Sequence, residues 1–262
     1  MKKHLLSSGL LLILSWALIS WGPIGHDTVA KIAADHLTPK AKAAVEKLLD
    51  GQTMPQVSNY ADQVRSDETA GLHYIDLPGG LNYEAFVKTI MEMKTQNAYS
   101  AILKLERNLA SPAISEKEKS IDLKYLIHLV GDIHQPMHVS HTADRGGTDI
   151  RVTFNGRDYN LHSLWDGGII AERETNYVQL AAACDTATPE QIKQWQNDAL
   201  ITWAWESYQI SEQLYAEAAK QKHLNNAYYS KYMSVIKQRL LQGGIRLAGL
   251  LNTIFDPESN KE

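Results

Sequence analysis

The sequence predicts a mainly helical, single-domain protein that contains one short β-hairpin. Of its 262 residues, 44% are apolar and 21% are charged, which is typical of a packed globular chain. Apolar side chains recur three and four positions apart in most segments, and only one segment alternates with a period of two. No internal repeat, low-complexity linker or proline- and glycine-rich boundary divides the chain, so we expect one domain over residues 21–262.

Residues 1–20 have the pattern of a secretory signal peptide. Two lysines precede an apolar run from Leu5 to Ile19, and the small residue Ser20 ends the segment. The run is too short and too early to span a bilayer comfortably; an uncleaved anchor or a buried helix is the alternative. We therefore expect cleavage before Trp21 and a secreted or periplasmic protein with no membrane anchor after processing.

Charge and cysteine content narrow the classes of function. The one cysteine, Cys184, excludes an internal disulfide, so an exported chain must rely on its core or on bound metal. Cleavage of the leader removes two lysines and leaves 24 lysines and arginines against 30 acidic residues, a net charge of about −6. This balance excludes nucleic-acid binding through a broad basic surface, which needs many contacts from lysine and arginine to phosphate. If the protein acts on phosphates, we expect a metal to supply the positive charge.

Residues that begin and end helices mark the first half of the chain. Thr38 is a good N-cap, Pro39 fits the first helical position, and Gly51 follows the last apolar residue of that segment. Ser115 and Glu118 have the spacing of a capping box at the start of a second periodic segment. We expect a helix after each of these two starts.

The second half of the chain continues the helical pattern. Thr188 and Pro189 begin one segment, which we expect to run as a single helix to residue 220. A further helix is expected over residues 226–254, although the pair Gly243–Gly244 could bend or interrupt it.

The one clear β signal lies over residues 150–162. Two short alternating runs flank Asn155–Gly156, a dipeptide that favours a two-residue hairpin turn. We expect one hairpin there.

Pairs of histidine and aspartate at helical spacing indicate a metal site. His128 and Asp132 are four residues apart, so a helix projects both from one face, and His162 and Asp166 repeat the spacing. His138 lies ten residues after His128. Imidazole and carboxylate together suit Zn²⁺ or, less selectively, other divalent ions. The alternative for one such pair alone is a capped or salt-bridged helix surface.

Upstream residues add a carboxylate and a guanidinium. Asp62 and Arg65 are three apart and would share a helix face, one suited to a metal and the other to a phosphate. A surface ion pair is the alternative for these two. His73, beside Tyr74, could equally be a packed strand or loop residue.

Trp21 and His26 gain a role if the leader is cut before Trp21. The new α-amine and the Trp21 carbonyl oxygen could then close a five-membered chelate ring on a metal, with His26 as a further donor. An α-amine has a pKa of ~7.7 to 8.0, so a metal displaces its proton at modest cost. The alternative makes Trp21 a hydrophobic staple before a helix that starts at His26.

Taken together, the segments resemble a known family. The stretches "WGPIGH", "YADQVR", "LHYIDLP", "YLIHLVGDIHQPMH", "GGTDIRVTFNG" and "NLHSLWD" are similar, in this order, to those of the trinuclear-zinc, single-strand-specific nucleases and 3′-nucleotidases of fungi and plants. The resemblance covers almost the whole chain after the leader. It implies the helical fold of the zinc-dependent nuclease and phospholipase C type.

The resemblance also implies three zinc ions and their ligands. The first ion would be held by Asp62, His73, His128 and Asp132; the second by the amine and carbonyl of Trp21, His26 and the bridging Asp132; and the third by His138, His162 and Asp166.

The implied reaction is cleavage of the P–O3′ bond in RNA and single-stranded DNA, giving 5′-phosphate products, together with removal of the 3′-phosphate from nucleotides. Arg65 would stabilise the pentacovalent phosphate, and Asp62 would orient the nucleophile as well as bind metal. Tyr74 is the candidate for stacking on a base and Asp76 for a hydrogen bond to its edge. Single-stranded nucleic acid and 3′-nucleotides are the implied substrates, and no stable protein partner is implied.

Two other functions fit part of the pattern. Zinc-dependent phospholipases C share the fold, but their last carboxylate ligand is typically glutamate where this chain has Asp166, and their two preceding histidines lie closer than the 24 positions between His138 and His162. A non-catalytic periplasmic zinc-binding protein would typically carry a histidine-rich loop, which this sequence lacks. His36, His134, His141 and His223 fit no ligand position.

Overall fold

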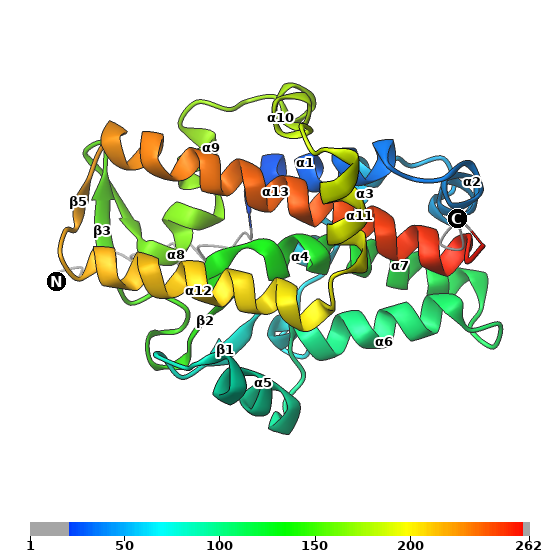
Figure 1. Cartoon of the computed structure of the whole chain (residues 1–262), viewed down its shortest axis with the longest axis horizontal. Helices are drawn as coiled ribbons and strands as arrows, with labels where there is room; N and C mark the ends of the chain where they lie inside the picture. Colours follow the sequence, from blue (N-terminus) through cyan, green and yellow to red (C-terminus); the bar gives the residue numbers. More distant parts are fainter. Residues whose placement is uncertain (1–20, 259–262) are drawn as a thin grey trace, which may run out of the picture.

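A computed structural model describes residues 21–258 of the chain (Figure 1). The signal peptide expected over residues 1–20 lies outside the described residues. The longer helices are α1 (Gly22–Asp35), α2 (Pro39–Leu49), α5 (Tyr83–Glu92), α6 (Ala98–Ala110), α7 (Glu116–His134), α10 (Tyr177–Cys184), α11 (Pro189–Asn197), α12 (Leu200–Ala218) and α13 (Asn226–Phe255). The mainly helical fold class is confirmed.

Short helical turns and strands connect these helices. The turns are α3 (Met54–Val57), α4 (Tyr60–Gln63), η1 (Ala70–His73), η2 (Pro136–His138), η3 (Thr142–Asp144), α8 (Leu161–Ser163), η4 (Leu164–Gly168) and α9 (Ile169–Ala171). The strands are β1 (Ile75–Leu77), β2 (Val139–His141), β3 (Arg151–Phe154), β4 (Arg157–Asn160) and β5 (His223–Leu224). No helix within residues 21–258 has the length and apolar character needed to cross a membrane.

Helix α7 runs into the centre of the molecule. Its start is the expected capping box, in which Ser115 accepts from the Glu118 amide and the Glu118 carboxylate accepts from the Ser115 amide. The first turns are polar and exposed, whereas every residue over 126–134 is buried. Around it pack α1, α2, α6, α12 and α13. The spacing of His128 and Asp132 therefore places two polar side chains inside the core.

The pair Gly243–Gly244 lies within one continuous helix, α13, and does not interrupt it. It lies where α1 packs along α13 (Figure 1). A Cβ atom built at Gly244 would lie only 2.5 Å from the Cβ of Ile32 on α1. At Gly243 the closest atom would be 3.4 Å away, which is ordinary contact. Gly244 therefore allows the two helices to approach closely.

The single helix expected from Pro189 to residue 220 is wrong, because the chain breaks between α11 and α12. Asp198 ends α11 with an extended backbone, and its carbonyl accepts a hydrogen bond from the Trp203 indole. Its carboxylate binds the Arg246 guanidinium of α13 at 2.6 Å. These tertiary contacts hold Asp198 outside a helix, although the local pattern favours one.

The expected hairpin is confirmed, and three further strands accompany it. Asn155 and Gly156 have φ angles of 48° and 78°, as a type I′ turn between β3 and β4 requires. Strand β5 pairs parallel to β3, and β1 pairs parallel to β2 in a separate two-stranded sheet. Strands β1, β2 and β5 were not expected, because strands of two or three residues are too short to show alternation.

The close approach of α1 and α13 predicts different effects for the two glycines of α13. Alanine raises helix propensity equally at both positions, so the difference between the variants reports the clash with Ile32. We expect Gly244→Ala to be less stable than Gly243→Ala by about 1–3 kcal/mol in urea unfolding of the purified protein. If the urea midpoints and the slopes of the unfolding curves are equal in the two variants, the contact between α1 and α13 is not tight at Gly244.

Candidate metal centre

The nine residues expected as metal ligands come from five separate parts of the chain and meet around the buried half of α7. Three sets among them have ligand atoms within 4.8 Å of one another: His73, His128 and Asp132; His26, Asp62 and His128; and His138, His162 and Asp166. We call the expected groupings the first site (Asp62, His73, His128, Asp132), the second site (Trp21, His26, Asp132) and the third site (His138, His162, Asp166).

At the first site, four side chains point at one spot. The Nε2 atom of His128 lies 3.2 Å from Nδ1 of His73 and 3.3 Å from Oδ2 of Asp132, and the latter two atoms are 2.9 Å apart. Oδ1 of Asp62 lies 3.5 Å from His128 Nε2 and 3.6 Å from His73 Nδ1. Ligands around a tetrahedral zinc lie about 3.3 Å from each other, given bonds of 2.0–2.2 Å. The spacing of these four side chains fits one ion.

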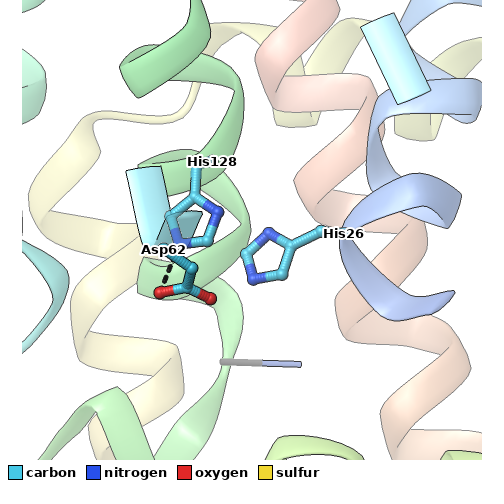
Figure 2. Close-up of side chains that lie close together, drawn as sticks. All are labelled: His26, Asp62 and His128. Atoms are coloured by element: carbon cyan, nitrogen blue, oxygen red, sulfur yellow. Dashed lines mark ion pairs between the residues drawn. The ribbon is translucent and has the colours of Figure 1, made fainter. Parts of the chain in front are cut away.

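At the second site, His26 faces α7 from α1. Its ring stacks on that of His128 with centroids 4.0 Å apart, and Figure 2 shows both rings beside the Asp62 carboxylate. Its Nε2 lies 3.6 Å from Oδ1 of Asp132, the oxygen that is not used at the first site. Neither ring nitrogen has a hydrogen-bond partner among residues 21–258. Burial and the neighbouring His128 lower the pKa of His26 to about 3, so the ring is neutral and has a lone pair for a metal.

Trp21 is anchored to the same stretch of α7. Its indole nitrogen donates to the carbonyl oxygen of Gly131 at 2.8 Å, and the residue is fully buried in a left-handed conformation. Helix α1 starts directly after it, at Gly22, and not at His26. Trp21 is therefore held by a hydrogen bond to the helix that carries Asp132, which a hydrophobic staple would not need.

At the third site, the His162 and Asp166 pair is completed by His138. Oδ2 of Asp166 lies 3.0 Å from Nε2 of His162, and Oδ1 lies 3.2 Å from Nε2 of His138. Asp166 belongs to the π-turn η4, which follows directly on the turn that carries His162. The other nitrogen of His138 is 3.5 Å from Asp132, so the third site adjoins the other two.

Backbone carbonyls fix the orientation of three imidazoles. The Nδ1 atoms of His128, His138 and His162 lie 2.8, 2.7 and 2.7 Å from the carbonyl oxygens of Ser58, His73 and Gly146. A carbonyl only accepts, so each Nδ1 carries a proton and each Nε2 is the ring nitrogen that faces the site. Hydrogen bonds of this kind orient histidine ligands in metalloproteins.

The buried carboxylates of the centre are ionised and need positive charge beside them. Burial opposes a charge on His128, but nearby carboxylates outweigh it and raise its pKa to about 10; the same balance raises the pKa of His138 to about 9. Burial likewise opposes ionisation of Asp132, but the neighbouring histidines hold its pKa well below its usual range, and that of Asp166 at about 2. Ionised carboxylates at this depth need positive charge beside them, from protons or from metal ions.

Four residues that the sequence analysis did not assign support the site. Gly131 leaves room for His26, since a Cβ there would lie 2.7 Å from its Nδ1. The Gln135 amide donates to Asp166 and accepts from the Met137 amide. Asp27 accepts hydrogen bonds from the Ser58 hydroxyl and from Asn59, just before α4. In the sequence, the roles of Gly131 and Gln135 were indicated only by a glycine inside an apolar helical segment and by a glutamine within "HQPMH". No sequence pattern indicated the roles of Asp27 and Ser58.

Arg65 departs from the expected geometry. Helix α4 carries Asp62 but ends at Gln63, so Asp62 and Arg65 do not share a helix face. The Arg65 amide instead donates to the Asp62 carbonyl oxygen at 3.3 Å, in a turn that closes the short helix. The prediction of a shared helix face is wrong because four residues are too few to carry both side chains on one helix.

Tyr74 and Asp76 follow His73; Tyr74 precedes strand β1 and Asp76 lies within it. Tyr74 is partly exposed in an extended conformation, and Asp76 pairs in register with Ser140 of β2. Burial raises the pKa of Asp76, while the charges of His162 and His138 oppose the shift. Its partner in the register, Ser140, lies two residues after His138 of the third site.

The four histidines that fit no ligand position pair with other groups. His36 pairs with Asp185, His141 with Glu212 and His223 with the Thr153 hydroxyl. The buried His134 lies between the Val130 carbonyl and the Arg246 guanidinium.

Comparisons with known proteins give one consistent result. The family model described as S1/P1 Nuclease matches residues 21–256. Endonuclease 2 of Arabidopsis thaliana is 31% identical over 262 aligned residues, and Endonuclease 4 of the same plant is 32% identical over 274; each alignment covers 90% of both chains. Nuclease P1 of Penicillium citrinum is 26% identical over 271 residues, which cover 92% of this chain and all of that protein.

The contact between Gln135 and Asp166 predicts a change in metal affinity at the third site. Gln135→Leu removes the amide that orients the carboxylate, so we expect a metal ion to bind there about 10- to 100-fold more weakly. The measurement is a titration of the metal-loaded protein with a chelator, following the released metal. One class of metal ion should leave at a lower chelator concentration in Gln135→Leu. The control Gln213→Leu, at an exposed position, should match the unaltered protein. Release unchanged in Gln135→Leu would show that the amide does not position Asp166.

Proposed function

Because the chain belongs to the S1/P1 nuclease family, we propose that it is a zinc-dependent phosphodiesterase that cuts RNA and single-stranded DNA at the P–O3′ bond. Membership of the family makes the chain a nuclease, a hydrolase of nucleic acid. The proposal adds 5′-phosphate products and removal of the 3′-phosphate from nucleotides.

One observation supports the proposal: carboxylates and imidazoles gather in three groups, and the Asp132 carboxylate lies 3.3 Å from Nε2 of His128 and 3.6 Å from Nε2 of His26. We infer one zinc at each of the first, second and third sites. Buried nitrogens of His26 and His138 and both oxygens of Asp62 lack hydrogen-bond partners among residues 21–258, as expected for groups that face a cation. Zinc ions there would polarise the phosphate oxygens and lower the pKa of water.

The residues of the chain have separate tasks in this reaction. Asp62 accepts a hydrogen bond from the attacking water and so directs its oxygen toward phosphorus. Arg65, on the turn that follows, binds the charge that builds up on the phosphate. The new P–O bond forms as the P–O3′ bond breaks, and the proton from water ends on the departing 3′ oxygen.

Tyr74 and Asp76 are the proposed contacts to a base. Asp76 pairs with Ser140 on the strand that follows His138, so a base beside it would belong to the nucleotide whose 3′ oxygen departs near the third site. Stacking on Tyr74 requires an unpaired base, which accounts for a preference for single strands.

The other two functions have less support. A phospholipase C of this fold would typically carry glutamate where this chain has Asp166, and the family model and relatives are nucleases. A protein that only stores zinc has no need for Arg65 in the turn after Asp62.

The proposed second site requires export and cleavage before Trp21. Only the cut releases the α-amine that, with the Trp21 carbonyl, completes this site. We therefore propose a secreted or periplasmic enzyme, with nucleic acid as its partner and no lasting protein partner.

The proposal is tested by the zinc content and activity of protein whose N-terminus is verified as Trp21. We expect three zinc ions per chain, release of acid-soluble nucleotides from single-stranded substrates well above duplex ones, and phosphate release from nucleoside 3′-phosphates. Full zinc occupancy with neither activity would refute the enzyme proposal.

Protein that keeps one extra residue before Trp21 provides a sharper comparison. Its nitrogen at Trp21 is an amide, which is a poor metal ligand, so we expect loss of one zinc and at least a tenfold loss of activity, about 1.4 kcal/mol. Three bound zinc ions and full activity in the extended protein would show that Trp21 is not a ligand.

A further inference from the structure

A pocket of about 690 Å³ opens next to the metal centre. On one side it is lined by Trp21 and Asp166, which belong to the second and third sites. On the other side it is lined by the hairpin β3–β4 and by the loop before it. Tyr74 and Asp76 are not among its lining residues within the described part of the chain. The pocket, here called the hairpin pocket, is therefore a second way out of the metal centre, separate from the proposed base contacts.

The lining of the hairpin pocket suits a nucleoside. Its apolar wall includes Pro23 and Ile170, and Tyr159 adds a partly buried aromatic ring. That ring lies over Gly168, where an added Cβ would be 2.7 Å from it. A pocket of this volume that is mostly apolar with a few polar groups is typical of a site for a small organic ligand.

Two arginines line the pocket, and within residues 21–258 only one of them is held in an ion pair. The guanidinium of Arg145 pairs with Asp149, which neutralises both. The exposed guanidinium of Arg151 makes no ion pair or hydrogen bond with any residue in 21–258. Asp158 also lines the pocket, from the neighbouring strand. In a chain with a net charge of −4, an arginine at the pocket that no residue in 21–258 holds in an ion pair is a ready contact for phosphate.

We propose that the hairpin pocket binds the nucleotide on the 3′ side of the cleaved bond, and that Arg151 contacts the next phosphate along the strand. This inference rests on the proposed function. The base of the nucleotide on the 5′ side is already directed to Tyr74 and Asp76. The rest of the strand is attached to phosphorus through a different oxygen, so it must leave the centre in another direction, and the hairpin pocket provides one.

This assignment separates the two activities of the enzyme. A nucleoside 3′-phosphate carries nothing on the 3′ side of its phosphate, so it leaves the hairpin pocket empty. A polynucleotide fills the pocket and reaches Arg151. Residues of the pocket should therefore affect cleavage of strands and leave 3′-phosphate removal unchanged.

The test is the variant Arg151→Ala, assayed on a single-stranded ten-nucleotide substrate and on a nucleoside 3′-phosphate. For the strand, kcat/KM should fall about tenfold, mainly through KM, with a weaker dependence on salt because one phosphate contact is lost. For the nucleoside 3′-phosphate, kcat/KM should not change. The control is Arg157→Ala, on the same hairpin but paired with Glu172 and not lining the pocket, which should leave both values unchanged.

Short substrates fix the direction of the strand. Extending a dinucleoside monophosphate by one nucleotide at its 3′ end should raise kcat/KM in the unaltered enzyme and not in Arg151→Ala. A gain of this kind from a 5′ extension would overturn the assigned direction. Equal losses on the strand and on the nucleoside 3′-phosphate, or no loss on either, would overturn the pocket assignment. Unaltered enzyme that cuts neither substrate would refute the proposed function instead.

A second variant tests the pocket without removing charge. Ala171 lines it and is exposed, so Ala171→Phe should narrow the pocket with little effect on folding. We expect the same selective loss on the strand as in Arg151→Ala. A Phe variant that cuts the strand at the normal rate would overturn the assignment.

Discussion

The carboxylate of Asp132 is completely buried and lies among the imidazoles of His26, His73 and His128. A carboxylate so deep in a protein costs several kcal/mol unless positive charge lies beside it. One carboxylate oxygen faces His73 and His128 and the other faces His26 and His138, so cations on both sides would offset this cost. The surrounding fold can be understood as the means of bringing these side chains together and keeping other atoms away.

The rest of the fold holds the end of α7 in place. The Ser207 hydroxyl of α12 donates to the Ile133 carbonyl at 2.6 Å, and the Arg239 guanidinium of α13 donates to the His134 carbonyl at 3.2 Å. Both carbonyls are near the end of the helix, where partners within the helix run out. Arg239 is in turn paired with Glu206. The long helices α12 and α13 thus hold the end of the helix that carries Asp132.

The sequence predicted features that depend on neighbours in the chain. The capping box at Ser115, the Asn155–Gly156 turn and the four-residue spacing of His128 and Asp132 needed only local rules. Features that depend on distant contacts were not predictable: the break at Asp198 requires Arg246 of another helix. Within the site, the resemblance indicated which side chains gather around α7, but the carbonyls and the Gln135 amide that orient them have no pattern of their own.

The role of Asp132 as a shared ligand is the central claim, and the zinc content of two single variants tests it most directly. Asp132→Asn and Asp166→Asn each replace one buried carboxylate by an amide of the same shape. In protein that begins at Trp21, mass spectrometry under native conditions should find two fewer zinc ions in Asp132→Asn and one fewer in Asp166→Asn. Loss of a single ion from both variants would contradict a carboxylate shared between two metals.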